Sequence, residues 1–231
     1  MEVLYEDNHI IIVNKKPGEI VQGDKTGDKP LSEIVKEWIQ EKYAKPGNVF
    51  LGVAHRLDRP VGGLVVFAKT SKALTRLNDM FRNGEVHKTY WAISRNNPEK
   101  ESDTLTHYIT TVERNNKSYA SATPTKDGKE SILKYKVIAH SDRYHLFEVQ
   151  LITGRKHQIR VQLSSIGCPV KGDLKYGDKR SNPDGSISLM ARNIQFVHPV
   201  SGKEINVTAP VPDDNLWQAL EAATDQNTHE S

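Results

Sequence analysis

Apolar and polar positions in the first third of the chain follow two different periods. Short apolar runs at residues 3–5 and 10–13 predict an antiparallel pair of strands. Residues 31–39 carry apolar side chains at the one-face spacing of an amphipathic helix. The uninterrupted apolar run at residues 64–68 predicts a strand that is buried on both faces.

The remainder of the chain continues this mixture of strands and helices. Ser71 is the predicted N-cap of a second helix, and residues 86–93 predict the next strand. Alternating side chains at residues 133–137 and 147–151 predict half-exposed strands of an antiparallel sheet. The further elements that we expect are a helix over 155–166, strands over 187–197 and 204–209, and a short final helix capped by Asp213 or Asp214.

Three stretches show neither period. Residues 22–30 and 94–105 are predicted to be loops, and residues 113–129 a mobile excursion. Strands that cluster without regular strand–helix–strand alternation favour an α+β fold with a mixed, mostly antiparallel β-sheet and flanking helices. We expect residues 1–224 to form a single domain and residues 225–231 a disordered tail.

Composition excludes several classes of protein. No apolar stretch approaches the roughly 20 residues that cross a bilayer, and the chain does not open on the basic start and apolar core of a secretory signal. We therefore expect no membrane partner. The single cysteine, Cys168, cannot form an internal disulfide, which favours a reducing cytoplasm.

Charge is distributed unevenly along the chain. The formal net charge is +3, and the segment after Lys203 holds six acidic residues but no Lys or Arg, which leaves +9 on residues 1–203. A basic body suits a polyanionic partner such as nucleic acid, although a merely solvated lysine-rich surface has the same composition. If that partner is RNA, the excursion at residues 113–129 is a segment that binding would order.

The densest cluster of candidate chemistry lies directly before the buried run. Asp58 stands between Arg56 and Arg59, and Pro60 restricts the backbone that follows. This arrangement delivers a carboxylate from a rigid element, as a catalytic site requires. An isolated aspartate in such a loop more often caps a turn.

Two long motifs decide between these interpretations, because together they resemble RluA-type pseudouridine synthases. The residues that carry the resemblance are His55-Arg56-Leu57-Asp58 with Gly63-Leu64 and Phe67-Ala68-Lys69-Thr70, then residues 151–160 (LITGRKHQIR) with Gly172-Asp173 and Tyr176-Gly177. The resemblance extends along the chain from Lys16-Pro17-Gly18 to His198-Pro199 and Ala209-Pro210. Such an enzyme isomerises uridine to pseudouridine in ribosomal or transfer RNA without cofactor or metal, and we expect a monomer.

The resemblance assigns Asp58 as the catalytic carboxylate, which attacks or deprotonates the target uridine. Arg155 matches the arginine that pairs with this aspartate, and a nearby guanidinium is a physical means of keeping a partly buried carboxylate ionised. Tyr90 matches the tyrosine of a Lys-x-Tyr element, here with Lys88. Its ring suits an extruded uracil, and its hydroxyl suits late proton transfer.

Further residues are candidates for holding the RNA. Arg56 is expected to enter the base stack when the uridine leaves, because a guanidinium plane stacks on bases. Lys156 and Arg160, one helical turn apart in the predicted helix, form a candidate phosphate grip. Ile159 is expected to form part of the pocket wall, with core packing as the alternative.

Three positions depart from the family pattern, and an extra RNA-binding module that many relatives carry is not expected here. Val61-Gly62 stand where Thr-Ser is usual before the glycine, and Met190 stands where a histidine is common. Because the first helix begins near residue 31, we expect no additional RNA-binding module ahead of Asp58. The substrate must then be held by the catalytic domain.

Two other functions remain as rivals. One is a noncatalytic RNA-binding protein, which the presence of Asp58 and Tyr90 argues against. The other is a hydrolase that uses Asp58 and Asp173 as acid and base, which leaves the arginines and Tyr90 unexplained. A metal site is not indicated, since the nine histidines show no His-x-x-x-His pair on a helix and there is no second cysteine.

Overall fold

The computed structural model describes residues 1–44 and 46–228, which form two compact units. Unit 1 comprises Met1–His87 and Asn193–Ala209, and unit 2 comprises Lys88–Arg192 and Pro210–Ser231. The candidate catalytic residues are divided between them, with Asp58 in unit 1 and both Tyr90 and Arg155 in unit 2. The boundary of a single catalytic domain at residue 224 stays a prediction.

Unit 1 is built on antiparallel strands. Its pairs join β1 (Glu2–Glu6) to β2 (Ile10–Lys15), β2 to β4 (Gly62–Ala68), and β3 (Gly52–Val53) to β4. The part of β10 (Leu189–Val197) that belongs to unit 1, from Asn193 on, pairs with β11 (Glu204–Thr208). Every residue of β4 is buried, as the continuous apolar run predicts. The predicted hairpin of β1 and β2 is confirmed.

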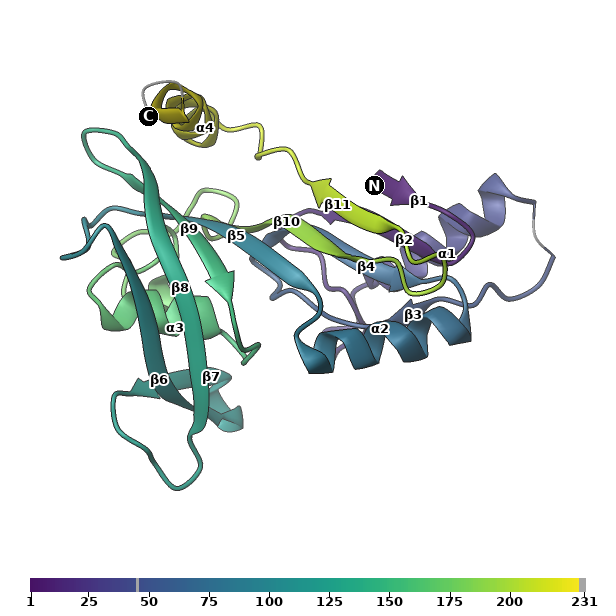
Figure 1. Cartoon of the computed structure of the whole chain (residues 1–231), viewed down its shortest axis with the longest axis horizontal. Coiled ribbons are helices and arrows are strands. Elements are labelled where there is room, and N and C mark those ends of the chain that lie inside the picture. Colours follow the sequence, from purple (N-terminus) through teal and green to yellow (C-terminus); the bar gives the residue numbers. More distant parts are fainter. Residues whose placement is uncertain (45, 229–231) are drawn as a thin grey trace. The chain divides into compact units, whose positions relative to one another are not determined.

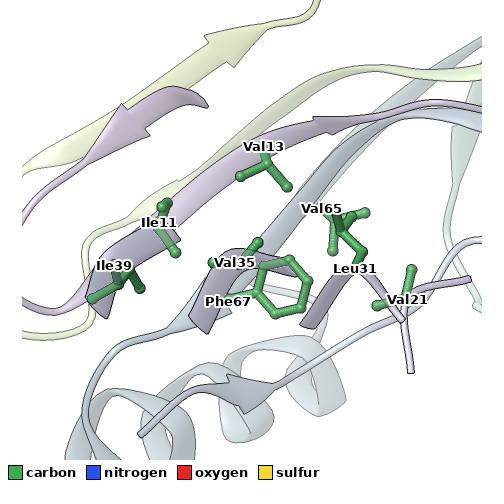
Figure 2. Packing of buried hydrophobic residues seen from close by; sticks show 8 residues of the cluster. All are labelled: Ile11, Val13, Val21, Leu31, Val35, Ile39, Val65 and Phe67. Atoms are coloured by element: carbon green, nitrogen blue, oxygen red, sulfur yellow. The ribbon is translucent and has the colours of Figure 1, made fainter. Parts of the chain in front are cut away.

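Helix α1 (Leu31–Lys42) supplies the apolar cover for β2 and β4. Its inward residues pack with Ile11 and Val13 of β2 and with Val65 and Phe67 of β4 (Figure 2). All these side chains are removed from water, so the core of unit 1 lies between the helix and this face of the strands. The amphipathic stripe in the sequence thus identified the packing face correctly.

Helix α2 (Ser71–Asn83) lies along β3 and β4 (Figure 1). Its N-cap is Thr70, whose hydroxyl accepts a hydrogen bond from the amide of Ala73 at 3.2 Å, so the prediction of Ser71 as the cap was wrong by one residue. Gly84 ends the helix in the left-handed conformation, at φ 74°.

Unit 2 contains an antiparallel sheet with neighbours in the order β5-β9-β8-β6-β7. The strands are β5 (His87–Ser94), β9 (His145–Leu151), β8 (Lys129–His140), β6 (Ser102–Val112) and β7 (Lys117–Ser121). Strands β8 and β9 alternate between buried and more exposed side chains over most of their length, as expected. The α+β fold with a mostly antiparallel sheet is therefore confirmed.

Two segments that lack apolar periodicity are nevertheless ordered. The end of the predicted loop at 94–105 belongs to β6, and the predicted excursion at 113–129 contains the short 3-10 helix η1 (Glu113–Asn115) and strand β7. Backbone pairing with β6 orders these polar residues, because the ladder bonds do not depend on side-chain type. The prediction of a mobile excursion was wrong.

Helix α3 (Gln158–Ser165) starts later than predicted. His157 has φ 56°, a left-handed conformation that interrupts helical geometry, so residues 155–157 form a loop ahead of the helix. The ring of His157 is held by the hydroxyl of Tyr176, 2.7 Å from Nδ1. This contact stabilises a conformation that a non-glycine residue rarely adopts.

Helix α4 (Asn215–Thr228) packs against β8. Asp214 caps it, because its Oδ1 accepts hydrogen bonds from the amides of Leu216 and Trp217 at 3.0 and 3.2 Å. The helix continues through 225–228, where the sequence predicted a disordered tail, and the rest of that prediction, 229–231, lies outside the described residues. Among the described helices, none has both the length and the apolar composition needed to cross a membrane.

Candidate active site

Asp58 lies in the loop between β3 and β4 and is half-buried. Its carbonyl oxygen accepts a hydrogen bond from the amide of Val61 at 3.0 Å, which closes a turn over residues 58–61. The carbonyl of Arg59 accepts from the amide of Gly18 at 2.7 Å. The backbone that carries the candidate catalytic carboxylate is therefore held on both sides.

Lys15 is the buried group on which this loop converges. Its side chain is only 1% exposed, and its ammonium lies 2.6 Å from the carbonyl of Val61, 3.2 Å from that of Arg59 and 3.3 Å from that of Asp58. The carbonyl of Lys16, at 3.2 Å, is a fourth acceptor. Burial lowers the pKa of Lys15 to about 8, since a charged amine is less favourable away from water.

The side chain of Arg59 connects the Asp58 loop to the polar segment at 22–30. Its Nη1 donates to Asp28 at 2.7 Å, and its Nη2 donates to Thr26 at 2.8 Å. The hydrogen bond from Arg59 lowers the pKa of Asp28. Arg59 therefore fixes a loop, whereas the neighbouring Arg56 has an exposed side chain, as a residue that enters an RNA stack requires.

His55 packs within unit 1. Its Nε2 accepts a hydrogen bond from the amide of Val66 at 2.9 Å, so this nitrogen carries no proton. Its ring lies 4.7 Å from that of Phe81. His55 is therefore a packing and hydrogen-bonding residue of unit 1. Among the described residues, no group of three or more His, Cys, Asp or Glu is arranged to hold a metal ion.

At the departure from the family pattern, a side chain at position 62 would meet a crowded site. A Cβ on Gly62 would stand 3.2 Å from Cδ of Pro17 and 3.3 Å from the carbonyl oxygen of Lys15, tighter than ordinary van der Waals contact. Val61 is buried, and its carbonyl is the shortest partner of Lys15. In this chain the ring of Pro17 thus occupies the space that a side chain at position 62 would need.

In unit 2, Lys88 and Tyr90 lie on β5, where Tyr90 pairs with Val149 of β9. The ring of Tyr90 is 6% exposed, and burial lowers the pKa of Lys88. Ile159 in α3 is likewise buried, at 4% exposure, which suits either the wall of a pocket or a core position. The catalytic role of Tyr90 and the RNA-binding roles of Lys88 and Ile159 stay predictions.

Arg155 lies in the loop before α3, and its backbone is pinned by the helix that follows. Oε1 of Gln158 accepts hydrogen bonds from the amide of Arg155 at 2.9 Å and from the hydroxyl of Thr153 at 3.0 Å. The side-chain nitrogen of Gln158, Nε2, donates a hydrogen bond to the carbonyl of Ile132 at 3.1 Å. Nε of Arg155 reaches the carbonyl of Glu130 at 3.4 Å, and its side chain is exposed.

The phosphate grip predicted from Lys156 and Arg160 is wrong for Arg160. Its guanidinium is buried and binds both carboxylate oxygens of Asp173, Nε at 2.7 Å and Nη2 at 3.0 Å. Lys156 does not lie one helical turn away, because it precedes the left-handed residue His157. Lys156 alone of this pair is exposed, and its ammonium lies 3.1 Å from Glu113.

The pairing of Asp173 also argues against the hydrolase. Both of its oxygens accept hydrogen bonds from Arg160, and the carboxylate is 2% exposed. A general acid or base must reach a substrate proton, and a carboxylate occupied by a buried guanidinium is poorly placed to do so. Asp173 is structural in this arrangement.

The comparisons with known proteins agree with the motifs. The family model described as RNA pseudouridylate synthase matches residues 9–165. The chain belongs to this family. The protein is accordingly an RNA pseudouridine synthase of the RluA type, an isomerase.

Individual relatives cover most of the chain. It is 31% identical to "tRNA pseudouridine synthase C" of Vibrio vulnificus, over 95% of this chain and 94% of the relative. It is 32% identical to "Ribosomal large subunit pseudouridine synthase C" of Rickettsia bellii, over 91% and 68%. The solved structure of human RNA pseudouridylate synthase domain containing 4 shares the fold, with a TM-score of 0.78, 23% identity and coverage of 97% and 93%.

Sequence reasoning missed two residues that position the candidate site, Lys15 and Gln158. Lys15 follows Ile11 and Val13 at intervals of two on β2, and this alternation directs its side chain towards the buried face. Gln158 stands three residues after Arg155, the spacing at which a glutamine near a helix start reaches back to a preceding amide. Both signals were present in the sequence.

Proposed function

We propose that the enzyme isomerises a uridine of ribosomal or transfer RNA, with Asp58 as the catalytic carboxylate. The observation that carries this proposal is the fixed loop of Asp58, whose carbonyls at positions 58, 59 and 61 share the ammonium of Lys15. A carboxylate on an immobilised backbone meets the uridine with little loss of orientational freedom. The choice of RNA follows the names of the relatives, of which one acts on tRNA and another on the ribosomal large subunit.

Arg155 is the proposed partner of Asp58. An exposed guanidinium on a loop pinned by Gln158 is preorganised to keep a carboxylate ionised and oriented. Tyr90 is the proposed platform for the extruded uracil, and Lys88 lies beside it on β5. Arg56, exposed in the same loop as Asp58, is the residue proposed to fill the vacated position in the RNA stack.

The setting of the reaction belongs to the same proposal. The lone cysteine, Cys168, is buried, which suits a reducing cytoplasm in which the RNA is also found. The enzyme is proposed to act as a monomer, a state that size-exclusion chromatography with light scattering tests directly. A mass of twice 26.0 kDa would contradict it.

Pseudouridine mapping of cellular RNA tests the function. Total RNA from cells with the native protein, with a deletion, with Asp58→Ala and with Asp58→Asn is labelled with carbodiimide and sequenced. We expect one or more pseudouridines to disappear in the deletion and in both Asp58 variants, because the neutral amide cannot attack or deprotonate.

The matched control is Asp142→Ala, which removes an exposed aspartate of unit 2. It should retain every site. Loss of a site in the deletion but not in the Asp58 variants would contradict the assigned catalyst while leaving the enzyme class intact. Immunoblotting of all variants confirms that the protein is present.

A further inference from the structure

Unit 2 contains a cavity beside Arg155 that the proposed chemistry at the target uridine does not use. It has a volume of about 420 Å³ and lies among the end of β6, η1, the start of β8 and the loop before α3. This size is within the range of pockets that bind small molecules. Residues from three separate segments of the chain, 109–113, 127–129 and 154–156, therefore line one cavity.

The lining of this cavity is polar and charged. Its cations are Lys129, Arg155 and Lys156, and its anions are Glu113 and Asp127. Among the described residues that line the cavity, only Ile109 has a large apolar side chain, and none is aromatic. Such a lining favours a charged, hydrated group over a stacked base or an apolar ligand.

The cationic wall is held in place by hydrogen bonds from its backbone. The amide of Arg155 donates to Gln158, and the carbonyl of Lys156 accepts a hydrogen bond from the hydroxyl of Ser118 at 2.8 Å. Lys129 stands on β8 at the same parity as the buried residues Ser131 and Leu133, so its side chain leaves the strand on their side. The backbone that carries Arg155 and Lys156 is thus fixed before any ligand arrives, and Lys129 lies on the strand face that these residues share with the cavity.

Lys156 is already paired in the absence of a ligand. Its ammonium lies 3.1 Å from Glu113, whose side chain is 79% exposed. An exposed ion pair of this kind contributes little to stability, so an incoming anion can replace the glutamate. Glu113 then competes with that anion for the same cation.

We propose that this cavity is a subsite for a phosphodiester of the RNA strand next to the target uridine, bound by Lys129 and Lys156. The inference rests on the proposed function, since Arg155 brings the cavity beside the reacting nucleotide only if it partners Asp58. When the phosphate binds in the cavity, it replaces Glu113 as the partner of Lys156. Removing either lysine should weaken binding, and removing Glu113 should strengthen it.

Salt-dependent RNA binding tests the subsite. The probe is a fluorescein-labelled twelve-nucleotide oligo(U), and its Kd is measured by anisotropy over a series of KCl concentrations. Lys129→Ala should reduce the slope of log K against log salt by about 0.7, the value for one phosphate contact on a single strand. Glu113→Gln should bind about two- to fivefold more tightly at low salt, the scale of an exposed ion pair.

The matched control is Lys134→Ala, an exposed lysine on the opposite face of the same strand β8. Its slope should equal that of the native protein. Any of three results would overturn the subsite. Lys129→Ala could leave the salt slope unchanged, Glu113→Gln could bind no more tightly, or the native protein could fail to bind oligo(U) at 50 mM KCl. Equal competition by polyglutamate, at matched charge, would overturn it in favour of an acidic protein partner.

Turnover separates this inference from the proposed function. On the RNA that the mapping experiment identifies, Lys129→Ala should raise KM and leave kcat unchanged. If the native enzyme forms no pseudouridine, the proposed function fails while the salt slopes still report on the cavity. If it forms pseudouridine and Lys129→Ala matches it in both constants, the subsite alone fails.

Discussion

At the scale of single residues, the Asp58 loop depends on a buried lysine. Lys15 directs its ammonium at four backbone carbonyls inside unit 1. A buried acceptor left without its donor lowers the free energy of unfolding by about 1–3 kcal/mol. Lys15→Met should therefore lower the free energy of unfolding by at least that amount, measured by urea denaturation at pH 7.

The stability contributed at this position should also depend on pH. The pKa of Lys15 falls from 10.5 to about 8 in the folded protein. Between these values the unfolded chain holds a proton that the folded chain has released, so stability rises with pH, whereas below about pH 8 the contribution is constant. The deficit of Lys15→Met relative to the native protein should widen from pH 8 to 10, and equal pH profiles would contradict the assignment.

A second residue-scale prediction concerns Gly62. Gly62→Ser places a Cβ against the ring of Pro17 and the carbonyl of Lys15, and overpacking of this kind costs about 1–3 kcal/mol. Thermal unfolding should show the loss. Pro17→Ala in the same chain should recover part of it, and a double variant no more stable than Gly62→Ser would show that the ring is not the obstacle.

At the scale of elements, the hydroxyl of Tyr176 is one of the groups that join the β6–β7 hairpin to the loop before α3. The oxygen of Tyr176 accepts a hydrogen bond from the buried amide of Ser118 at 2.8 Å and lies 2.7 Å from Nδ1 of His157. The ring also packs with Ile109 of β6 and Val161 of α3. These contacts add to the backbone pairing that orders the polar hairpin, and they stabilise the positive φ of His157.

Tyr176→Phe should consequently destabilise unit 2. The amide of Ser118 would lose its acceptor while remaining buried, which costs about 1–3 kcal/mol. Hydrogen exchange should show faster opening of β7 in the variant. The control is Tyr119→Phe, whose exposed hydroxyl bonds to Asn115 at 3.1 Å; an equal loss there would remove the special role of Tyr176.

At the scale of the whole molecule, the proposed catalytic pair draws on both compact units, with Asp58 in one and Arg155 in the other. A double-mutant cycle with Asp58→Asn and Arg155→Lys tests the pair. Each single change should lower kcat/KM by about 100-fold or more, as loss of a preorganised electrostatic partner does.

The double variant should be no slower than the slower single variant. When two residues act as a unit, the first substitution already removes their joint contribution to the rate, so the second removes nothing more. Additive losses would mean that the two residues act independently. Single-turnover measurements on the RNA identified by mapping separate the chemical step from binding. The variant Arg143→Lys, an exposed arginine of unit 2, provides the control for the arginine substitution.

The sequence by itself determined the family, the fold class and most buried elements. Apolar periodicity located α1 and β4 because burial of their side chains drives their formation. The ordered motifs supplied Asp58, Tyr90 and Arg155 as the candidate catalytic residues. Local composition misplaced β7 and the start of α3, since backbone pairing with β6 and the left-handed turn at His157 override side-chain propensity.

Only the tertiary structure decided which charged residues face solvent and which are buried. Arg160 and Lys156 look alike in sequence, yet one is buried with Asp173 and the other remains exposed beside a cavity. Lys15 and Gln158 acquire their roles from carbonyls and amides contributed by other segments. Such partners are distant along the chain, so their pairing is a property of the folded backbone that no local pattern contains.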